Sequence, residues 1–148
     1  RLYERLRDIS YEDFSRNDKK KDFQNIVKSL LMSFSTEETR VNILGNTREI
    51  WEHLKKEDIY ELKQVLQELM VNMRKHSRAS SVGIRFEQKA NTLRVYYTDN
   101  GIGFPPDSSF GNGLRNTGNR INSIGGSINF GSGTGGGLTI QIQIPVRP

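Results

Sequence analysis

Four polar side chains lie along one flank of a helix that the sequence predicts over residues 58–79, beside its apolar stripe. Glu68 and Asn72 are four residues apart, and Lys75 and His76 follow one turn later. Together they offer a carboxylate, a neutral oxygen ligand, an ammonium and an imidazole. A metal-bound polyphosphate needs such a set: oxygen for Mg²⁺, cations for the phosphates and a base for the attacking group. An ordinary polar helix face that holds charge pairs fits the same residues, so this segment alone leaves both interpretations open.

A second group follows a predicted strand, in the run Asp99–Phe104. A carboxylate at the end of a strand can accept a hydrogen bond from a ligand amine. Gly101 and Gly103, on either side of Ile102, would let that ligand lie against the backbone because they carry no side chains. Asp-Asn-Gly is also strong turn chemistry, and a plain turn remains the alternative.

A third group leads into a predicted helix, with the order Gly111, Asn112, Gly113, Leu114. Free backbone amides at a helix start suit phosphate oxygens. The spacing differs from a P-loop, which has a Lys-Ser or Lys-Thr pair after its second glycine. It also differs from a dinucleotide-binding fingerprint, because no parallel βαβ unit is evident.

The elements that must position these groups follow from periodicity. Apolar residues spaced by three and four predict an early helix that carries Phe23, Ile26, Val27, Leu30, Leu31 and Phe34. Alternation predicts strands around residues 82–86 and 93–97, joined at Ala90-Asn91, and further strands over 40–44, 127–130 and 138–144. A shorter helix fits residues 114–124, ended by Gly125-Gly126. Helices early and strands late predict a two-layer α/β (α+β) sandwich with a mixed, mainly antiparallel sheet.

Composition limits the class of protein. The chain has 148 residues, a formal net charge of +5 and no cysteine, which excludes disulfide scaffolds, zinc fingers and thiol nucleophiles. No apolar run approaches the roughly 20 residues that cross a bilayer. The only basic run, residues 19–21, lacks interleaved aromatics, so a solvated loop is favoured over a nucleic-acid patch. Of the 14 glycines, 12 fall at or after Gly101, which indicates a shaped backbone there.

Taken in order along the chain, these segments resemble the GHKL ATPases, which include gyrase-type topoisomerases, heat-shock chaperones, sensor histidine kinases and mismatch-repair ATPases. The likeness covers residues 59–145. It is closest to the catalytic ATP-binding domain of a bacterial two-component sensor histidine kinase, on the tracts 75–77, 113–121 and 125–128. The short gap between Phe104 and Gly111 implies a short ATP lid, similar to that of nitrate-sensor and thermosensor kinases.

The resemblance implies a Bergerat-type fold and a role for each matching residue. Asn72 would coordinate Mg²⁺, Lys75 and His76 would contact the phosphates of ATP, and Asp99 would take the adenine amino group. The pocket around the base would be shaped by Gly101, Ile102 and Gly103, and the lid would begin at Gly111, Asn112, Gly113 and Leu114. Glu68 occupies the position that acts as general base in the hydrolysing members.

The resemblance also implies partners. Residues 16–148 would form the catalytic domain, and residues 1–15 the tail of a dimerisation helix. His53 lacks the acidic neighbour of a phosphoacceptor, so we expect the acceptor histidine on an upstream domain, a homodimer in the full protein, and a fragment that binds ATP without phosphorylating itself. A response regulator would be the next partner, with no direct nucleic-acid contact. The domain would be cytoplasmic, and anchoring of the parent protein in the inner membrane stays open.

One departure keeps two alternatives in view. The family usually has threonine where this chain has Leu138, so a hydroxyl near the adenine carboxylate is lost unless Thr98 or Thr139 replaces it. The first alternative is an anti-sigma-type serine kinase or a hydrolysing GHKL ATPase. The second is a module that binds a nucleotide or a protein partner without catalysis.

Overall fold

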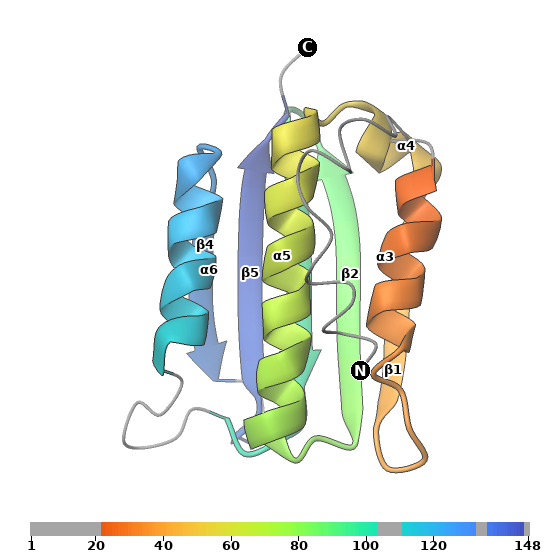
Figure 1. Cartoon of the computed structure of the whole chain (residues 1–148), viewed down its shortest axis with the longest axis vertical. Coiled ribbons are helices and arrows are strands. Elements are labelled where there is room, and N and C mark those ends of the chain that lie inside the picture. The colour runs from red at the N-terminus through yellow and green to blue at the C-terminus, as the bar shows by residue number, and fades with distance from the viewer. Residues whose placement is uncertain (1–21, 104–110, 133–135, 147–148) are drawn as a thin grey trace.

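The computed structural model describes residues 22–103, 111–132 and 136–146, and the expected tail at residues 1–15 lies outside them. One sheet and one layer of helices form the fold (Figure 1). The strands, in chain order, are β1 (Arg40–Leu44), β2 (Ser81–Lys89), β3 (Thr92–Asp99), β4 (Ser127–Ser132) and β5 (Leu138–Pro145). The helices are α3 (Phe23–Met32), α4 (Arg48–Glu52), α5 (Lys56–Asn72) and α6 (Gly111–Ser123), and a π turn η2 (Met73–Ser77) continues α5.

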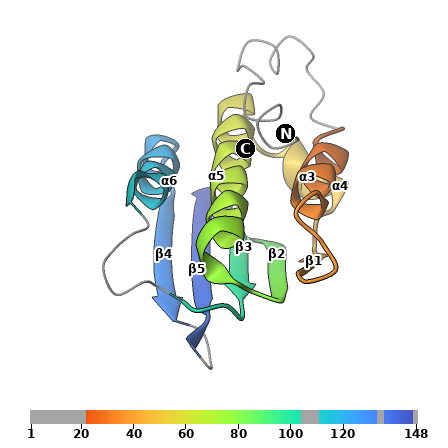
Figure 2. The ribbon, with the colours of Figure 1, turned by 60° about the horizontal axis from the view of Figure 1, so that its bottom comes forward.

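The sheet has the spatial order β1-β2-β3-β5-β4. β1 pairs with β2 in parallel, and every other pair is antiparallel. The helices lie side by side on one face, with α5 between α3 and α6 (Figure 2). The predicted two-layer sandwich with a mixed, mainly antiparallel sheet is therefore confirmed.

The core lies between the sheet and this helix layer. Alternate residues of each central strand point into it, as in the run Leu93, Val95 and Tyr97 of β3. Trp51 of α4 fills the space between α3 and β2. Its ring meets those of Phe23 and Phe86 edge to face, with centroids 4.8 and 5.4 Å apart.

The opposite face of the sheet carries the intervening residues, and no helix of the described residues covers it (Figure 2). Gly83, Thr98 and Thr139 form a row of small residues across β2, β3 and β5. Beside this row, the guanidinium of Arg85 stacks on the ring of Tyr96, 4.2 Å from its centroid.

Several details of the helices differ from the sequence prediction; the last helix, for example, begins at Gly111 rather than at residue 114. The long helix begins at Lys56 rather than Asp58, and it ends as the π turn η2 instead of continuing to Ala79. Arg78 then adopts a left-handed conformation with φ of 55°, which breaks the helix before β2 starts. The short helix α4 was not predicted, because five residues are too few to show a period.

The predicted end of the last helix is confirmed. Gly125 has φ of +80°, its amide donates to the carbonyl of Asn122 (3.0 Å), and the amide of Gly126 donates to that of Ile121 (2.9 Å). These two bonds form a Schellman motif, which turns the chain from α6 into β4. Within the described ranges, no helix combines the length and the apolar character needed to traverse a bilayer.

Candidate functional site

The predicted site residues come from four elements that end or begin at one edge of the molecule, the lower edge in Figure 1. There η2 ends, β3 ends at Asp99, β5 begins at Leu138 and α6 begins at Gly111. The sheet register pairs Asp99 directly with Leu138. The structure thus brings together three groups that are far apart in the sequence.

Asp99 is the most constrained residue of this edge, with 5% of its surface exposed. One carboxylate oxygen, Oδ2, accepts a hydrogen bond of 2.6 Å from the Tyr97 hydroxyl. The other, Oδ1, accepts from the Gly101 amide at 2.9 Å and more weakly from the Leu138 amide at 3.4 Å. An ionised carboxylate offers about four acceptor positions, so Asp99 retains capacity for a ligand donor.

Asn100 fastens the same turn to the start of β2. Its side-chain oxygen accepts from the amides of Ser80 and Ser81, both at 2.9 Å, and its side-chain nitrogen donates to the Ser80 hydroxyl at 2.9 Å. These long-range bonds hold the end of β3 beside the start of β2. The predicted turn chemistry is present in the bond from the Gly101 amide to Asp99 Oδ1, two residues back, which is an Asx turn.

Gly101 and Gly103 have a role within the protein itself. A Cβ on Gly101 would lie 2.1 Å from the Ser77 carbonyl oxygen, and one on Gly103 (φ +77°) would lie 2.2 Å from that of Gly136. The Ile102 amide, which lies between them, donates to the Ser77 carbonyl at 2.8 Å. The loop is thus clamped between η2 and the residues that precede β5, and glycine permits that close approach. Ile102 itself is 60% exposed.

The helix flank is shaped by the π turn. Asn72 is the last residue of α5, whereas Lys75 and His76 belong to η2, so a wider turn than an α-helix sets their direction. Lys75 is exposed, and Glu68, Asn72 and His76 are half-buried. The Asn72 amide nitrogen is buried without a hydrogen-bond partner in the described part of the chain, and so is the Ser77 hydroxyl.

These unpartnered groups fit a polar ligand such as a nucleotide; the Asn72 nitrogen is a hydrogen-bond donor, and the side-chain oxygen is the Asn72 atom that could hold a metal ion. A buried amide or hydroxyl that no protein group satisfies is costly, and a polar ligand would supply the missing bond. No three His, Cys, Asp or Glu side chains gather to hold a metal anywhere in residues 22–103, 111–132 and 136–146. A cation beside Asn72 would therefore take its other oxygens from ligand phosphates and water, which is the usual coordination of Mg²⁺.

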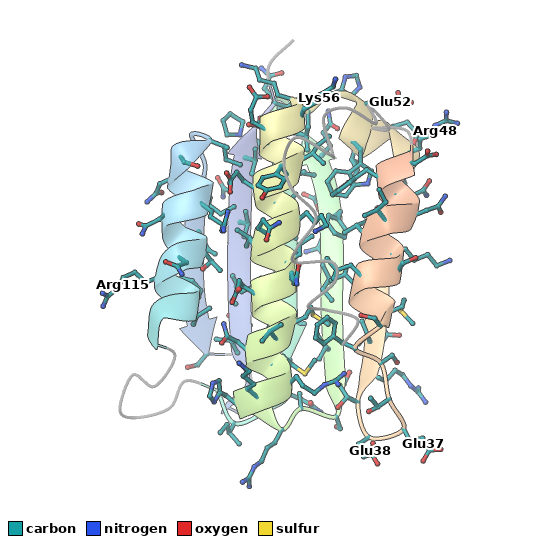
Figure 3. The ribbon with its side chains drawn as sticks, in the orientation of Figure 1. Glu37, Glu38, Arg48, Glu52, Lys56 and Arg115 are labelled. Carbon is teal, nitrogen blue, oxygen red and sulfur yellow. The ribbon has the colours of Figure 1, made fainter. Side chains whose placement is uncertain are left out.

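The start of α6 forms the remaining side of this edge. Gly111, Asn112 and Gly113 are its first residues, and the buried Leu114 follows them. Arg115 projects from α6 on the side away from α5 (Figure 3). The loop over residues 104–110, where the lid was expected, lies outside the described residues.

Sequence reasoning missed the contact between Tyr97 and Asp99. The signal was present, because alternation along β3 places residues 97 and 99 on the same face of the sheet. The same alternation excludes the suggested compensation for Leu138. Thr98 and Thr139 are paired with each other on the opposite face, so neither hydroxyl replaces the one that is absent at position 138.

Sequence comparison finds one family model, described as histidine kinase-, DNA gyrase B-, and HSP90-like ATPase, over residues 57–148. The chain is 35% identical over 91 residues to the sensor histidine kinase LiaS of Bacillus subtilis, which covers 59% of this chain and 25% of that protein. It is 34% identical over 89 residues to the signal transduction histidine-protein kinase/phosphatase DegS of Brevibacillus brevis, which covers 57% and 22%. The chain thus spans about a quarter of the length of these relatives.

Structure comparison finds the same fold. The histidine kinase domain of the blue-light-activated histidine kinase from Erythrobacter litoralis superposes with a TM-score of 0.68. The match has 22% sequence identity and covers 86% of this chain and 61% of that one. At this level of identity the superposition establishes the architecture.

Proposed function

Because this chain belongs to the family of histidine kinase-, DNA gyrase B- and HSP90-like ATPases, we propose that it is the ATP-binding catalytic domain of a sensor histidine kinase. The observation that carries the proposal is the buried Asp99 carboxylate, which has protein donors on both oxygens and room for one more. A buried acceptor of this kind suits the exocyclic amine of adenine.

The other residues are assigned roles around that contact. Asn72 holds Mg²⁺ through its side-chain oxygen, and Lys75 and His76 contact the phosphates. Gly101, Ile102 and Gly103 border the base, and the first residues of α6, Gly111, Asn112, Gly113 and Leu114, present helix-start amides to the phosphates. Bound Mg²⁺ supplies charge neutralisation on the phosphate oxygens.

The reaction is transfer of the γ-phosphoryl group to a histidine nitrogen, with ADP as the leaving group. The chain contributes mainly position and charge, because phosphoryl transfer asks for little covalent chemistry from the protein. His53 is exposed on the far side of the molecule from Asp99, after α4, which agrees with an acceptor outside this domain.

The proposal extends to the rest of the signalling chain. The acceptor histidine belongs to an upstream dimerisation domain, of which residues 1–15 are the end, and residues 16–148 are the catalytic domain. The full protein is a homodimer that passes the phosphoryl group to a response regulator. The domain works in the cytoplasm, on its own or beneath a membrane anchor of the parent protein.

Isothermal titration calorimetry with Mg-ATP tests the proposal. We expect the unmodified chain to bind, and Asp99→Asn to weaken binding about 10- to 100-fold, because a hydrogen bond to a charged acceptor contributes about 1.5–3 kcal/mol. Glu87→Gln, the same change on the opposite face of the sheet, is the matched control. Asn72→Ala should weaken ATP binding in the presence of Mg²⁺ and have little effect in EDTA. Asn42 is exposed, so Asn42→Ala should leave ATP binding unchanged under both conditions.

Two results would redirect the assignment. Equal ATP affinity for the unmodified chain, Asp99→Asn and Asn72→Ala would remove its basis. Steady phosphate release by the chain, abolished by Glu68→Ala, would instead favour a hydrolysing ATPase.

A further inference from the structure

Tyr97 places its hydroxyl on the residue that the proposed function assigns to adenine recognition. The ring is buried in the core, with 2% of its surface exposed, and the hydroxyl donates to Asp99 Oδ2 at 2.6 Å. That distance is shorter than a typical bond between neutral oxygens and is typical of a hydroxyl that donates to a carboxylate, a strong, charge-assisted bond. The contact joins the hydrophobic core directly to the candidate site.

The geometry of a strand explains why a tyrosine fills this role. Side chains two residues apart lie on the same face, roughly 7 Å apart along the strand. A hydroxyl on a short side chain would not span that separation, whereas a tyrosine that leans along β3 carries its oxygen to the next inward position. On β5, Leu138 lies opposite Asp99 and offers only its amide, at 3.4 Å. Thus, among the described residues, Tyr97 is the only side chain that donates to this carboxylate.

We infer that Tyr97 is a positioning residue for nucleotide recognition, which orients the Asp99 carboxylate so that one acceptor position faces the exocyclic amine of adenine. The inference rests on the proposed function, since it takes Asp99 as the adenine contact. The Gly101 amide fixes Oδ1 and the Tyr97 hydroxyl fixes Oδ2, so the carboxylate is held from both ends. Without the hydroxyl, Oδ2 has no donor among the described residues, and the carboxylate is held through Oδ1 alone, so its orientation is less restricted.

The environment keeps this hydroxyl in its donating form. Burial, together with the neighbouring Asp99 charge, raises the pKa of Tyr97 well above its ordinary value. The phenol therefore stays protonated throughout the physiological range, and its bond to Asp99 does not depend on pH there. It acts as a fixed part of the site.

The test is Tyr97→Phe, which removes one oxygen and keeps the ring. Calorimetry would compare Mg-ATP with purine riboside triphosphate, the analogue that lacks the 6-amino group. We expect about tenfold weaker ATP binding, in line with the loss of one charge-assisted bond, and unchanged binding of the analogue. Tyr96→Phe is the matched control, because that ring lies on the opposite face against Arg85. In an Asp99→Asn background, Tyr97→Phe should have no further effect on ATP affinity.

The outcomes separate the inference from its premise. No binding of ATP by the unmodified chain would remove the proposed function itself. Normal ATP affinity in Tyr97→Phe, or an equal loss for ATP and the analogue, would overturn the positioning role while the nucleotide site stands. If Tyr97→Phe fails to fold, the hydroxyl proton of Tyr97 in the unmodified chain gives a second readout by NMR. Its signal should move on addition of ATP and stay unchanged with the analogue; no difference between the two would overturn the inference.

Discussion

Replacement of Gly101 by alanine tests the clamp that holds the turn after β3. The added Cβ would lie 1.9 Å from the Ser77 hydroxyl oxygen and 2.1 Å from the Ser77 carbonyl oxygen. The hydroxyl can rotate away, but the carbonyl belongs to the backbone of η2 and accepts the Ile102 amide at 2.8 Å. The clash therefore has to be relieved by separation of the turn from the helix end, by about 1 Å, to reach an ordinary contact.

The size of the effect follows from what that separation breaks. Overpacking of a tight contact costs about 1–3 kcal/mol, and weakening of the Ile102 bond adds about 0.5–1.5 kcal/mol. We expect a loss of about 2–4 kcal/mol in the free energy of unfolding, which corresponds to a decrease in Tm of about 5–15 °C for a chain of this size. ATP affinity should also fall, because Asp99 receives the Gly101 amide at 2.9 Å.

Urea unfolding, followed by the fluorescence of the single, buried Trp51, measures this change. Gly118→Ala is the matched control, because a Cβ there meets no atom within 4 Å. In the middle of α6 that change should stabilise the protein by up to about 1 kcal/mol. Ser77→Ala should fail to rescue Gly101→Ala, since the carbonyl remains. A Gly101→Ala variant as stable as the parent, or rescue by Ser77→Ala, would refute the reasoning.

Two further predictions concern charge. Burial lowers the pKa of Lys63 from its ordinary 10.5 to about 8, so between these values the unfolded chain binds more protons and the free energy of unfolding rises with pH. Lys63→Met should abolish that rise and should stabilise the protein at pH 7 by at most about 3 kcal/mol. Urea unfolding between pH 7 and 10.5 measures both effects. An unchanged pH dependence of the free energy of unfolding in this variant would contradict the prediction. The ion pair between Arg120 of α6 and Glu61 of α5 (2.7 Å) is partly exposed, so Arg120→Met should cost less than about 1 kcal/mol, and 1 M NaCl should remove most of the difference in Tm. A larger loss that persists in salt would show that packing, rather than charge, joins the two helices.

The sequence predicted well where a period repeats. The helix that carries Phe23 and Leu30, the long helix before β2, and the alternating strands β3 and β5 are all present, because each buries one face against a single core. Alternation also shows which face each strand residue occupies, and it places Asp99 on the same face as Tyr97. The glycine pair after α6 was recognisable because a helix stop needs a positive φ.

The parts that escaped prediction depend on distant neighbours. The parallel pairing of β1 with β2 is set by the crossover through α4 and α5, and nothing local to Arg40–Leu44 encodes it. The π turn at Met73–Ser77 brings the Ser77 carbonyl to Ile102, a contact between segments 25 residues apart. Gly101 was expected to give room to a ligand, which stays a prediction; the close approach of Ser77 to its backbone was not foreseen. Alternation predicts Tyr97 as a buried residue of β3, but it does not show that the hydroxyl reaches Asp99.

The strict alternation of β3 side chains between the two faces of the sheet affects how this domain can vary over evolution. Tyr97 and Asp99 face the helices, whereas Tyr96 and Thr98 face the uncovered side of the sheet. Because Tyr96 and Thr98 lie on the other face of the sheet from Asp99, substitutions there need not disturb the candidate site. That surface can therefore diversify while the site residues stay the same. A single-residue insertion or deletion between Val95 and Asp99 would exchange the two sets and turn the carboxylate outward. Lineages of this domain should therefore accept gaps at the Ala90-Asn91 turn, and keep the length of the strand that follows it constant.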